Sequence, residues 1–307
     1  MIKDLNNAKK IINKPSHRIA FILGNGINRF AYKDNVDPSW SKLLLDAWDG
    51  ASFSTKTSID EGITFTEFYD LLEFESDPKK ITQSIIDSIE EWDPTDYHQS
   101  LRDALIRLDK PVLTTNFDMY LEGVNMKKLI LDHPTFGKGF TYYYPWNVVY
   151  SPDSKFSIHN IYNFGIWHIN GSINYPLSLK LSLTSYTRQG KRALDYLHVK
   201  NYDDDFDGKN QSHWKGLNTW LHLIFNCDLF ILGLGLDEQE TFLRWLLIER
   251  MKYFRRFPDR KRKGWYVGLK TEMTEGKKFF LESIGFELIQ LDNYEDIYVN
   301  LLDVSKV

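Results

Sequence analysis

The fold is decided by the stretch Arg18-Ile-Ala-Phe-Ile-Leu-Gly-Asn-Gly26. Its apolar residues run directly into the turn Gly24-Asn25-Gly26, which is typical of a buried strand that ends in a tight turn. Small residues at such a turn let backbone amide groups approach a phosphate closely. The dehydrogenase pattern Gly-x-Gly-x-x-Gly is absent, because Arg29 stands at the third glycine position. An anion-binding turn and an ordinary strand-to-helix turn both remain open here, although Asn28 and Arg29 supply donors suited to phosphate oxygens.

The C-terminal third of the chain alternates regularly between helix and strand patterns. A second glycine turn, Gly233-Leu234-Gly235, follows one of its apolar strands and precedes a strong helix pattern, so it offers a further amide-lined pocket. The alternation predicts βαβ units and a parallel sheet, with strands at 228–232, 265–267 and 286–291 and helices at 217–225, 238–254, 274–282 and 295–302.

Helix patterns fill the region between the first strand and residue 108. Asp37-Pro38-Ser39 offers an N-cap to the first of them. The apolar spacing predicts helices at 40–48, 66–74, 80–92 and 97–108. We therefore predict one α/β domain over residues 1–307, with a Rossmann-like, mostly parallel sheet and a helical insertion at about residues 39–108.

A strand pattern at residues 111–118 changes abruptly from apolar to polar side chains. This change is typical of the carboxyl end of a strand in an α/β sheet, where chemistry is often placed. It brings Thr115, Asn116 and Asp118 to one strand end. A capping segment is the simpler interpretation of an isolated Thr-Asn-x-Asp motif, so this segment alone does not define a site.

A second strand pattern, at residues 166–171, also ends in polar residues. Because His168 and Asn170 are two residues apart, we expect their side chains to point to the same side of the strand. A histidine on an apolar strand is usually a satisfied core residue, but the neighbouring Gly171-Ser172 favours a functional role. Elsewhere the sequence predicts irregular loops at 136–162, a half-buried strand at 178–183 and a polar loop at 201–211.

Composition and the absence of known motifs exclude further classes of function. The 307 residues carry 38 Lys and Arg against 42 Asp and Glu, a formal net charge of -4, which disfavours nucleic acid and anionic membrane as partners. Cys227 is the single cysteine, so we expect no internal disulfide and no Cys-rich zinc site. The N-terminus lacks the apolar stretch of a signal peptide, and we expect a cytoplasmic protein without membrane spans. The Walker, zincin and α/β-hydrolase motifs are absent.

Four of these segments, taken in order, resemble the nucleotide-site motifs of the sirtuin superfamily. The resemblance extends over roughly residues 18 to 240 and is closest to the bacterial sirtuin-like domains, many of which are implicated as NAD-depleting effectors in antiphage defence. Abortive-infection proteins with an N-terminal Gly-Asn-Gly motif and a later His-x-His-Gly motif are similar too. The matching segments are Phe21 to Asn28, Thr114 to Asp118, His168 to Ser172 and Leu232 to Gly235.

The resemblance implies roles for individual residues. Asn116 would hold the nicotinamide ribose or the attacking water, and Asp118 would orient that amide or the nicotinamide. The family's catalytic histidine directly precedes Gly-Ser, a position that Asn170 occupies here, while His168 lies two residues earlier. The NAD diphosphate would lie against the first glycine turn and the adenosine against the second, with the binding set Gly24, Asn25, Gly26, Asn28, Arg29, Thr115, Gly233 and Gly235.

The function implied by the resemblance is hydrolysis of NAD to nicotinamide and ADP-ribose by an antiphage-defence effector. The alternative is a catalytically silent sensor or scaffold that binds NAD or an ADP-ribose derivative, which the asparagine at the family's histidine position favours. The partners implied are NAD or an ADP-ribose derivative, with a homo-oligomer or a defence-system partner protein as the protein partner to look for. Lysine deacylation is disfavoured, because the deacylase branch resembles a fold with a four-cysteine zinc module that this chain cannot build.

Overall fold

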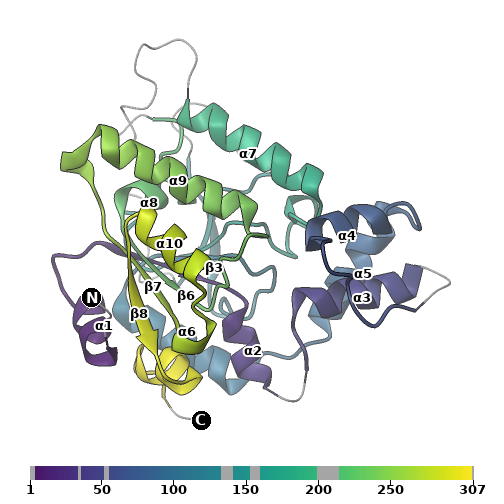
Figure 1. Ribbon diagram of the computed structural model, residues 1–307, viewed down its shortest axis with the longest axis horizontal. Helices are drawn as coiled ribbons and strands as arrows, with labels where there is room; N and C mark the ends of the chain where they lie inside the picture. The colour runs from purple at the N-terminus through teal and green to yellow at the C-terminus, as the bar shows by residue number, and fades with distance from the viewer. Residues whose placement is uncertain are drawn as a thin grey trace.

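An eight-stranded, mostly parallel mixed sheet forms the centre of the molecule (Figure 1). The computed structural model describes residues 4–33, 36–51, 55–132, 141–152, 160–198 and 214–305. The strand order is β3-β4-β5-β2-β1-β6-β7-β8, in which the first two strands run antiparallel to their neighbours and the rest are parallel. The bounds are β1 Ile19–Leu23, β2 Val112–Thr114, β3 Lys127–Ile130, β4 Val148–Ser151, β5 Ile166–His168, β6 Asp228–Leu232, β7 Gly264–Leu269 and β8 Phe286–Leu291.

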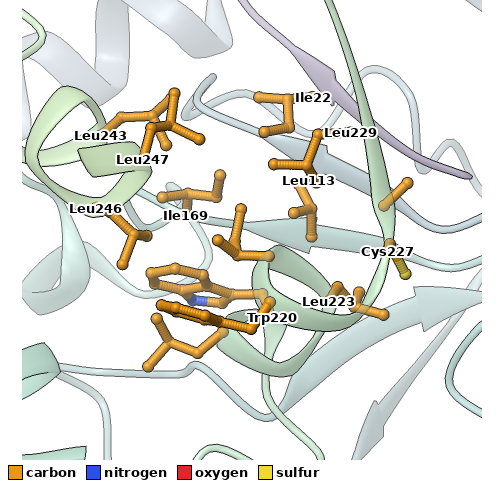
Figure 2. Packing of buried hydrophobic residues seen from close by; sticks show 14 of the residues in the cluster. Ile22, Leu113, Ile169, Trp220, Leu223, Cys227, Leu229, Leu243, Leu246 and Leu247 are labelled. Atoms are coloured by element: carbon orange, nitrogen blue, oxygen red, sulfur yellow. The ribbon is translucent and has the colours of Figure 1, made fainter. Parts of the chain in front are cut away.

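Helices cover both faces of this sheet, which confirms the predicted Rossmann-like α/β class. Successive residues of β1 are buried on opposite faces, because side chains alternate along a strand. Ala20 and Ile22 pack under α7 (Leu183–Leu197), α8 (Trp220–Asn226), α9 (Thr241–Arg256) and α10 (Glu275–Ser283). Figure 2 shows part of this layer, with Trp220 and Leu246 facing the sheet residues Ile22 and Leu113.

The opposite face of the sheet is covered by α1 (Leu5–Ile12), α6 (Asp96–Leu108) and the C-terminal residues. Ile19, Phe21 and Leu23 of β1 contribute to this second cluster. The predicted C-terminal helix at 295–302 is a short π-helix, η4 (Asp296–Asn300). Three 3-10 turns complete the set of short elements: η1 (Pro176–Ser178), η2 (Pro258–Arg260) and η3 (Lys270–Glu272).

The helical insertion after the first strand has its own apolar cluster, built by α3 (Trp40–Ala51), α4 (Phe65–Leu72) and α5 (Pro78–Glu90). These helices lie together at one side of the sheet in Figure 1. The last helix of the predicted insertion, α6, instead packs Leu101 and Leu105 on the sheet. A further short helix, α2 (Gly26–Tyr32), directly follows the first glycine turn and was not predicted.

The prediction of a strand at 178–183 is wrong. Residues 179–182 lie outside the sheet, and Ser182 begins helix α7 by accepting a hydrogen bond from the Ser185 amide at 2.9 Å. The alternating pattern has another cause, because Leu179 and Leu181 are buried in the cluster of the helical insertion. The predicted loop region at 136–162 contains strand β4, and β3 was also not predicted. The predicted polar loop at 201–211 lies outside the described residues.

Candidate functional site

A large cavity opens at the carboxyl ends of the central parallel strands. Its volume is about 1160 Å³, which is ample for a dinucleotide-sized ligand. β1 pairs with β2 on one of its edges and with β6 on the other, so the strand order reverses at β1. Ligands of open α/β sheets bind at such a reversal point. Side chains of the helical insertion, including Trp40 and Phe65, form part of the cavity wall.

Four segments that are far apart in the sequence meet at this cavity. Ten of the twelve residues that the sequence analysis singled out line its wall: Asn25, Gly26, Asn28, Arg29, Thr115, Asn116, Asp118, Asn170, Gly233 and Gly235. Gly24 and His168 are the two that do not line it. These segments meet because neighbouring strands end at the same height in the sheet: Leu23 of β1 pairs with both Thr114 of β2 and Leu232 of β6.

The two glycine turns pack directly on each other. The Gly26 amide donates a hydrogen bond of 2.7 Å to the Gly233 carbonyl, so it is already used within the protein. A Cβ atom at Gly24 would lie 2.5 Å from the Gly233 carbonyl oxygen. Gly24, which the resemblance assigns to the diphosphate, lets the second turn approach, and its contact with a diphosphate stays a prediction. Gly233, with φ of +67°, completes the contact in a conformation that favours glycine.

Asn116 lines the cavity and carries a buried hydrogen-bond donor without a partner among the described residues. Its backbone amide donates to Thr114 Oγ1 at 3.1 Å, which fixes the start of the loop after β2. The side chain is only 7% exposed, and its Nδ2 atom has no hydrogen-bond partner among the described residues. Buried polar groups are nearly always paired, so an unpaired amide at a cavity wall indicates a place for a ligand atom.

Asp118 is held by donors from two different elements. Its Oδ2 atom accepts from Asn28 Nδ2 at 2.7 Å, and its Oδ1 atom accepts from the Tyr120 amide at 3.2 Å. Burial raises the pKa of this carboxyl to about 6, although the Asn28 and Tyr120 donors act in the opposite direction. A carboxyl with this pKa is mostly ionised at neutral pH and is able to accept a proton.

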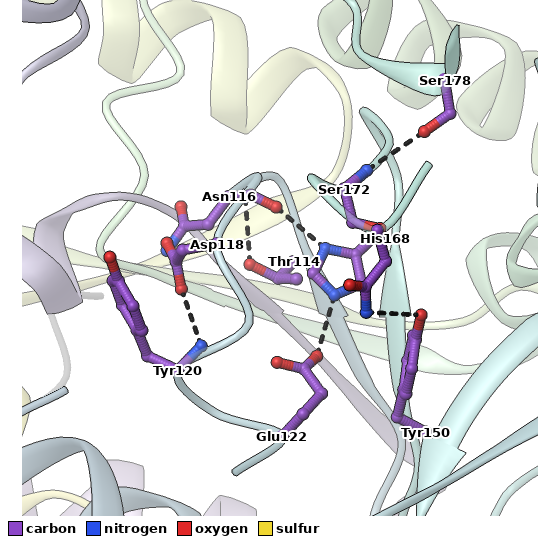
Figure 3. Close-up of polar contacts among 10 residues, drawn as sticks. Thr114, Asn116, Asp118, Tyr120, Glu122, Tyr150, His168, Ser172 and Ser178 are labelled. Atoms are coloured by element: carbon purple, nitrogen blue, oxygen red, sulfur yellow. Dashed lines mark hydrogen bonds and ion pairs between the residues drawn. The ribbon is translucent and has the colours of Figure 1, made fainter. Parts of the chain in front are cut away.

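His168 is not among the residues that line the cavity, and its ring is held on both sides (Figure 3). Its Nδ1 atom lies 2.9 Å from the Asn116 carbonyl oxygen, and its Nε2 atom lies 2.8 Å from Glu122 Oε1. Burial alone would lower the pKa of His168, but the Glu122 carboxylate, the Asn116 carbonyl and the Asp118 carboxylate together outweigh this effect and raise it. Both ring nitrogens face oxygen acceptors, an arrangement that favours the imidazolium form. An imidazolium has no lone pair with which to take a proton.

The expectation that His168 and Asn170 share one side of a strand is wrong, because β5 ends at His168. Asn170 lies in the turn that follows and reaches the cavity wall. Its carbonyl accepts from the Lys180 amide at 3.0 Å, and Gly171 has a φ of +89°. Strand alternation therefore does not extend to Asn170, and the turn alone decides where its side chain points.

Several residues of the site were not anticipated from the sequence. His98, Glu122 and Tyr298 belong to helix or loop segments without a recognisable motif. Glu240, at the start of α9, lines the cavity, and burial with the nearby Asp237 raises its pKa to about 7. Tyr298 stands beside the first glycine turn, where a Cβ atom on Gly26 would meet its hydroxyl.

No protein-family model matches the chain, and no curated protein matches it. Within the described residues, no group of three or more His, Cys, Asp or Glu side chains is placed to hold a metal ion. In the same part of the chain, no helix is both long enough and apolar enough to cross a bilayer.

Proposed function

We propose that the protein binds NAD in this cavity and hydrolyses it to nicotinamide and ADP-ribose. The observation that carries the proposal is the buried Asn116 amide, which has no partner among the described residues and lies where the four motif segments meet. The resemblance to bacterial sirtuin-like domains gives an asparagine at this place a role on the nicotinamide ribose. Arg29 and Lys277, which also line the cavity, supply cationic groups for the diphosphate.

The proposed chemistry needs few protein groups. Water attacks C1′ of the nicotinamide ribose, and the bond to the pyridinium nitrogen breaks with its electron pair, so nicotinamide leaves as a neutral molecule. Asn116 Nδ2 would donate to a ribose hydroxyl or to the attacking water. Asp118 would take the proton that the water loses. A cavity closed by apolar side chains of the insertion, such as Leu43, would strengthen these polar contacts by excluding bulk water.

The test is nicotinamide release by the purified protein incubated with NAD, compared with Asn116→Ala. We expect the substitution to lower release by at least about a hundredfold, the usual order for one donor to a developing charge. Asn6→Ala, on the exposed surface of α1, is the matched control and should keep the wild-type rate. Full activity of Asn116→Ala would refute the assignment.

A second candidate function is a sensor that binds NAD or an ADP-ribose derivative without cleaving it. It is favoured by the position of His168, which is held between Asn116 and Glu122 and does not line the cavity, and by Asn170 at the family's histidine position. The sensor predicts tight binding of ADP-ribose with no nicotinamide release. Release that depends on Asn116 would exclude it.

The proposal includes a role in antiphage defence, because many of the sirtuin-like domains that this chain resembles are implicated there. Cells that express the protein should lose NAD on infection and yield fewer phage plaques. Cells that express Asn116→Ala at the same level should retain NAD and plaque normally. Equal protection by both proteins would separate any defence role from NAD hydrolysis.

A further inference from the structure

A chain of buried and partly buried hydrogen bonds runs from the start of helix α6 to the cavity, and all of its donors point the same way. It begins at the Thr95 amide, which donates to His98 Nδ1 at 3.0 Å. A backbone N–H can only donate, so His98 Nδ1 carries no proton. The neutral ring must then carry its proton on Nε2, which lies 3.1 Å from Asn28 Oδ1. His98 is fully buried, and burial, with Arg102 nearby, lowers its pKa to about 4, so the ring is neutral at physiological pH.

The far end of the chain has an equally fixed polarity. Asn25 Nδ2 donates to the Pro38 carbonyl at 2.6 Å, so its Oδ1 atom is free to accept from Asn28 Nδ2 at 3.0 Å. A carbonyl can only accept, and therefore both ends demand the same orientation of the Asn28 amide. In that orientation the Asn28 amino group also faces Asp118 Oδ2 at 2.7 Å.

We propose that His98 is a positioning residue for the cavity: its Nε2–H form fixes the Asn28 amide so that the amino group faces Asp118. The chemistry at Asp118 rests on the proposed function, but the orientation of the chain does not. If the Asn28 amide were reversed, its carbonyl oxygen would face the Asp118 carboxylate and the Asn25 oxygen. Such oxygen-to-oxygen contacts in a buried site are costly, and reversal would also set the His98 N–H against the Asn28 amino group, so the His98 donor reinforces the one arrangement that pairs every group.

Other charged and aromatic groups surround Asp118 and His98, the two residues that the Asn28 amide connects. Asp118 is also influenced by Glu122 and His168, whose charges act in opposite directions on its pKa. The rings of Tyr32, Tyr97 and Tyr120 surround His98, with centroids 5.5, 6.1 and 5.3 Å away. Of the groups that act on Asp118, the Asn28 donor is the one that depends on His98, and it lowers the pKa of this carboxyl.

The first test needs no ligand. In protein labelled with ¹⁵N-histidine, long-range proton–nitrogen correlation at pH 7 should give the neutral Nε2–H form for His98. The signal is assigned by its absence from His98→Asn. An Nδ1–H form or an imidazolium at this pH would overturn the proposal, whether or not the protein cleaves NAD.

The second test uses two substitutions that separate the two ring nitrogens. His98→Asn keeps an acceptor near the Nδ1 position for the Thr95 amide but removes the donor to Asn28. His98→Gln keeps a donor near the Nε2 position. We expect kcat/KM for NAD at pH 6 to fall about tenfold or more in His98→Asn, as for a lost hydrogen bond to a buried group, and to stay within about threefold in His98→Gln.

A pH profile distinguishes positioning from a general loss of structure. In His98→Asn the acid limb of kcat/KM should move to higher pH, because Asp118 loses the support of the Asn28 donor. In His98→Gln the limb should stay at the wild-type pH. An unmoved limb in both variants, with equal rates, would overturn the proposal. If the wild type releases no nicotinamide, the proposed function fails, and the histidine spectrum alone still decides the orientation of the chain.

Discussion

At the scale of single residues, the site depends on which polar side chains face the cavity and which are turned into the protein. Both Asn116 and Asp118 line it, Asn116 with a buried donor that has no partner among the described residues and Asp118 with a carboxylate that accepts from Asn28 and Tyr120. His168 is also a polar residue and belongs to the adjacent strand β5, but its Nδ1 atom contacts the Asn116 carbonyl oxygen. The imidazole therefore stabilises the loop that carries the amide, and Asp118 is the stronger candidate for the base.

Asp118 determines the expected pH dependence. Its pKa is raised to about 6, so the carboxylate is present above this pH and is lost by protonation below it. We expect kcat/KM for NAD to fall about tenfold per pH unit below pH 6, as the base becomes protonated. Glu240 also lines the wall, and burial raises its pKa to about 7. The profile of Glu240→Gln should keep the limb near pH 6, and a flat profile from pH 5 to pH 8 would contradict the role of Asp118.

At the scale of elements, the two glycine turns act as a single packed unit. Gly24 and Gly26 allow the chain after β1 to touch the chain after β6, and the Gly26 amide seals this contact. The glycines are thus required mainly so that the two turns of this chain can pack closely on each other. In the proposed NAD complex, side chains such as Arg29, and not the Gly26 amide, would contact the phosphates.

Two glycine substitutions should have opposite effects on stability. At Gly24 an alanine Cβ would lie 2.5 Å from a carbonyl oxygen and 2.8 Å from Leu234 Cβ, so we expect a loss of about 1–3 kcal/mol in the free energy of unfolding. At Gly190, within α7, the added Cβ would have nothing within 4 Å. Gly190→Ala should therefore raise the free energy of unfolding by about 0.5–1 kcal/mol. Denaturant titration measures both, and a neutral Gly24→Ala would show that the turns separate easily.

At the scale of the whole molecule, the cavity exists because the strand order reverses at β1 and because α3, α4 and α5 lie over the strand ends. The insertion and the sheet have separate apolar clusters, but both contribute side chains to the same wall. Gln239, beside α9, reinforces this arrangement by accepting from the Phe65 amide of α4 at 3.1 Å.

A ligand that contacts both parts should stabilise the whole molecule. ADP-ribose is the suitable probe because it lacks the bond to nicotinamide. At one hundred times its Kd it should add about 2.7 kcal/mol to the free energy of unfolding, since it binds only the folded state. Thermal unfolding with and without millimolar ADP-ribose measures this effect. An unchanged midpoint with both ADP-ribose and NAD would contradict dinucleotide binding and, with it, both candidate functions.

The amino-acid sequence alone determined the α/β class, most of the strands of the parallel sheet and the segments that end at the cavity. These features depend on local signals: the apolar run before Gly24, the change to polar residues at Thr115 and the regular alternation after residue 217. Local signals were insufficient at 178–183, where burial of Leu179 and Leu181 against the insertion imitated a strand. They also missed β3 and β4, whose pairing is with each other and with β5.

Only the tertiary structure decided the roles of individual side chains. Burial of Gly24 against the second turn, the His168 contact with Glu122 and the His98 contact with Asn28 join residues 46 to more than 200 positions apart. No local pattern encodes such pairs, because each depends on where separate elements come together. The sequence placed polar residues at strand ends, and the packing of those ends determined which of them line the cavity and which do not.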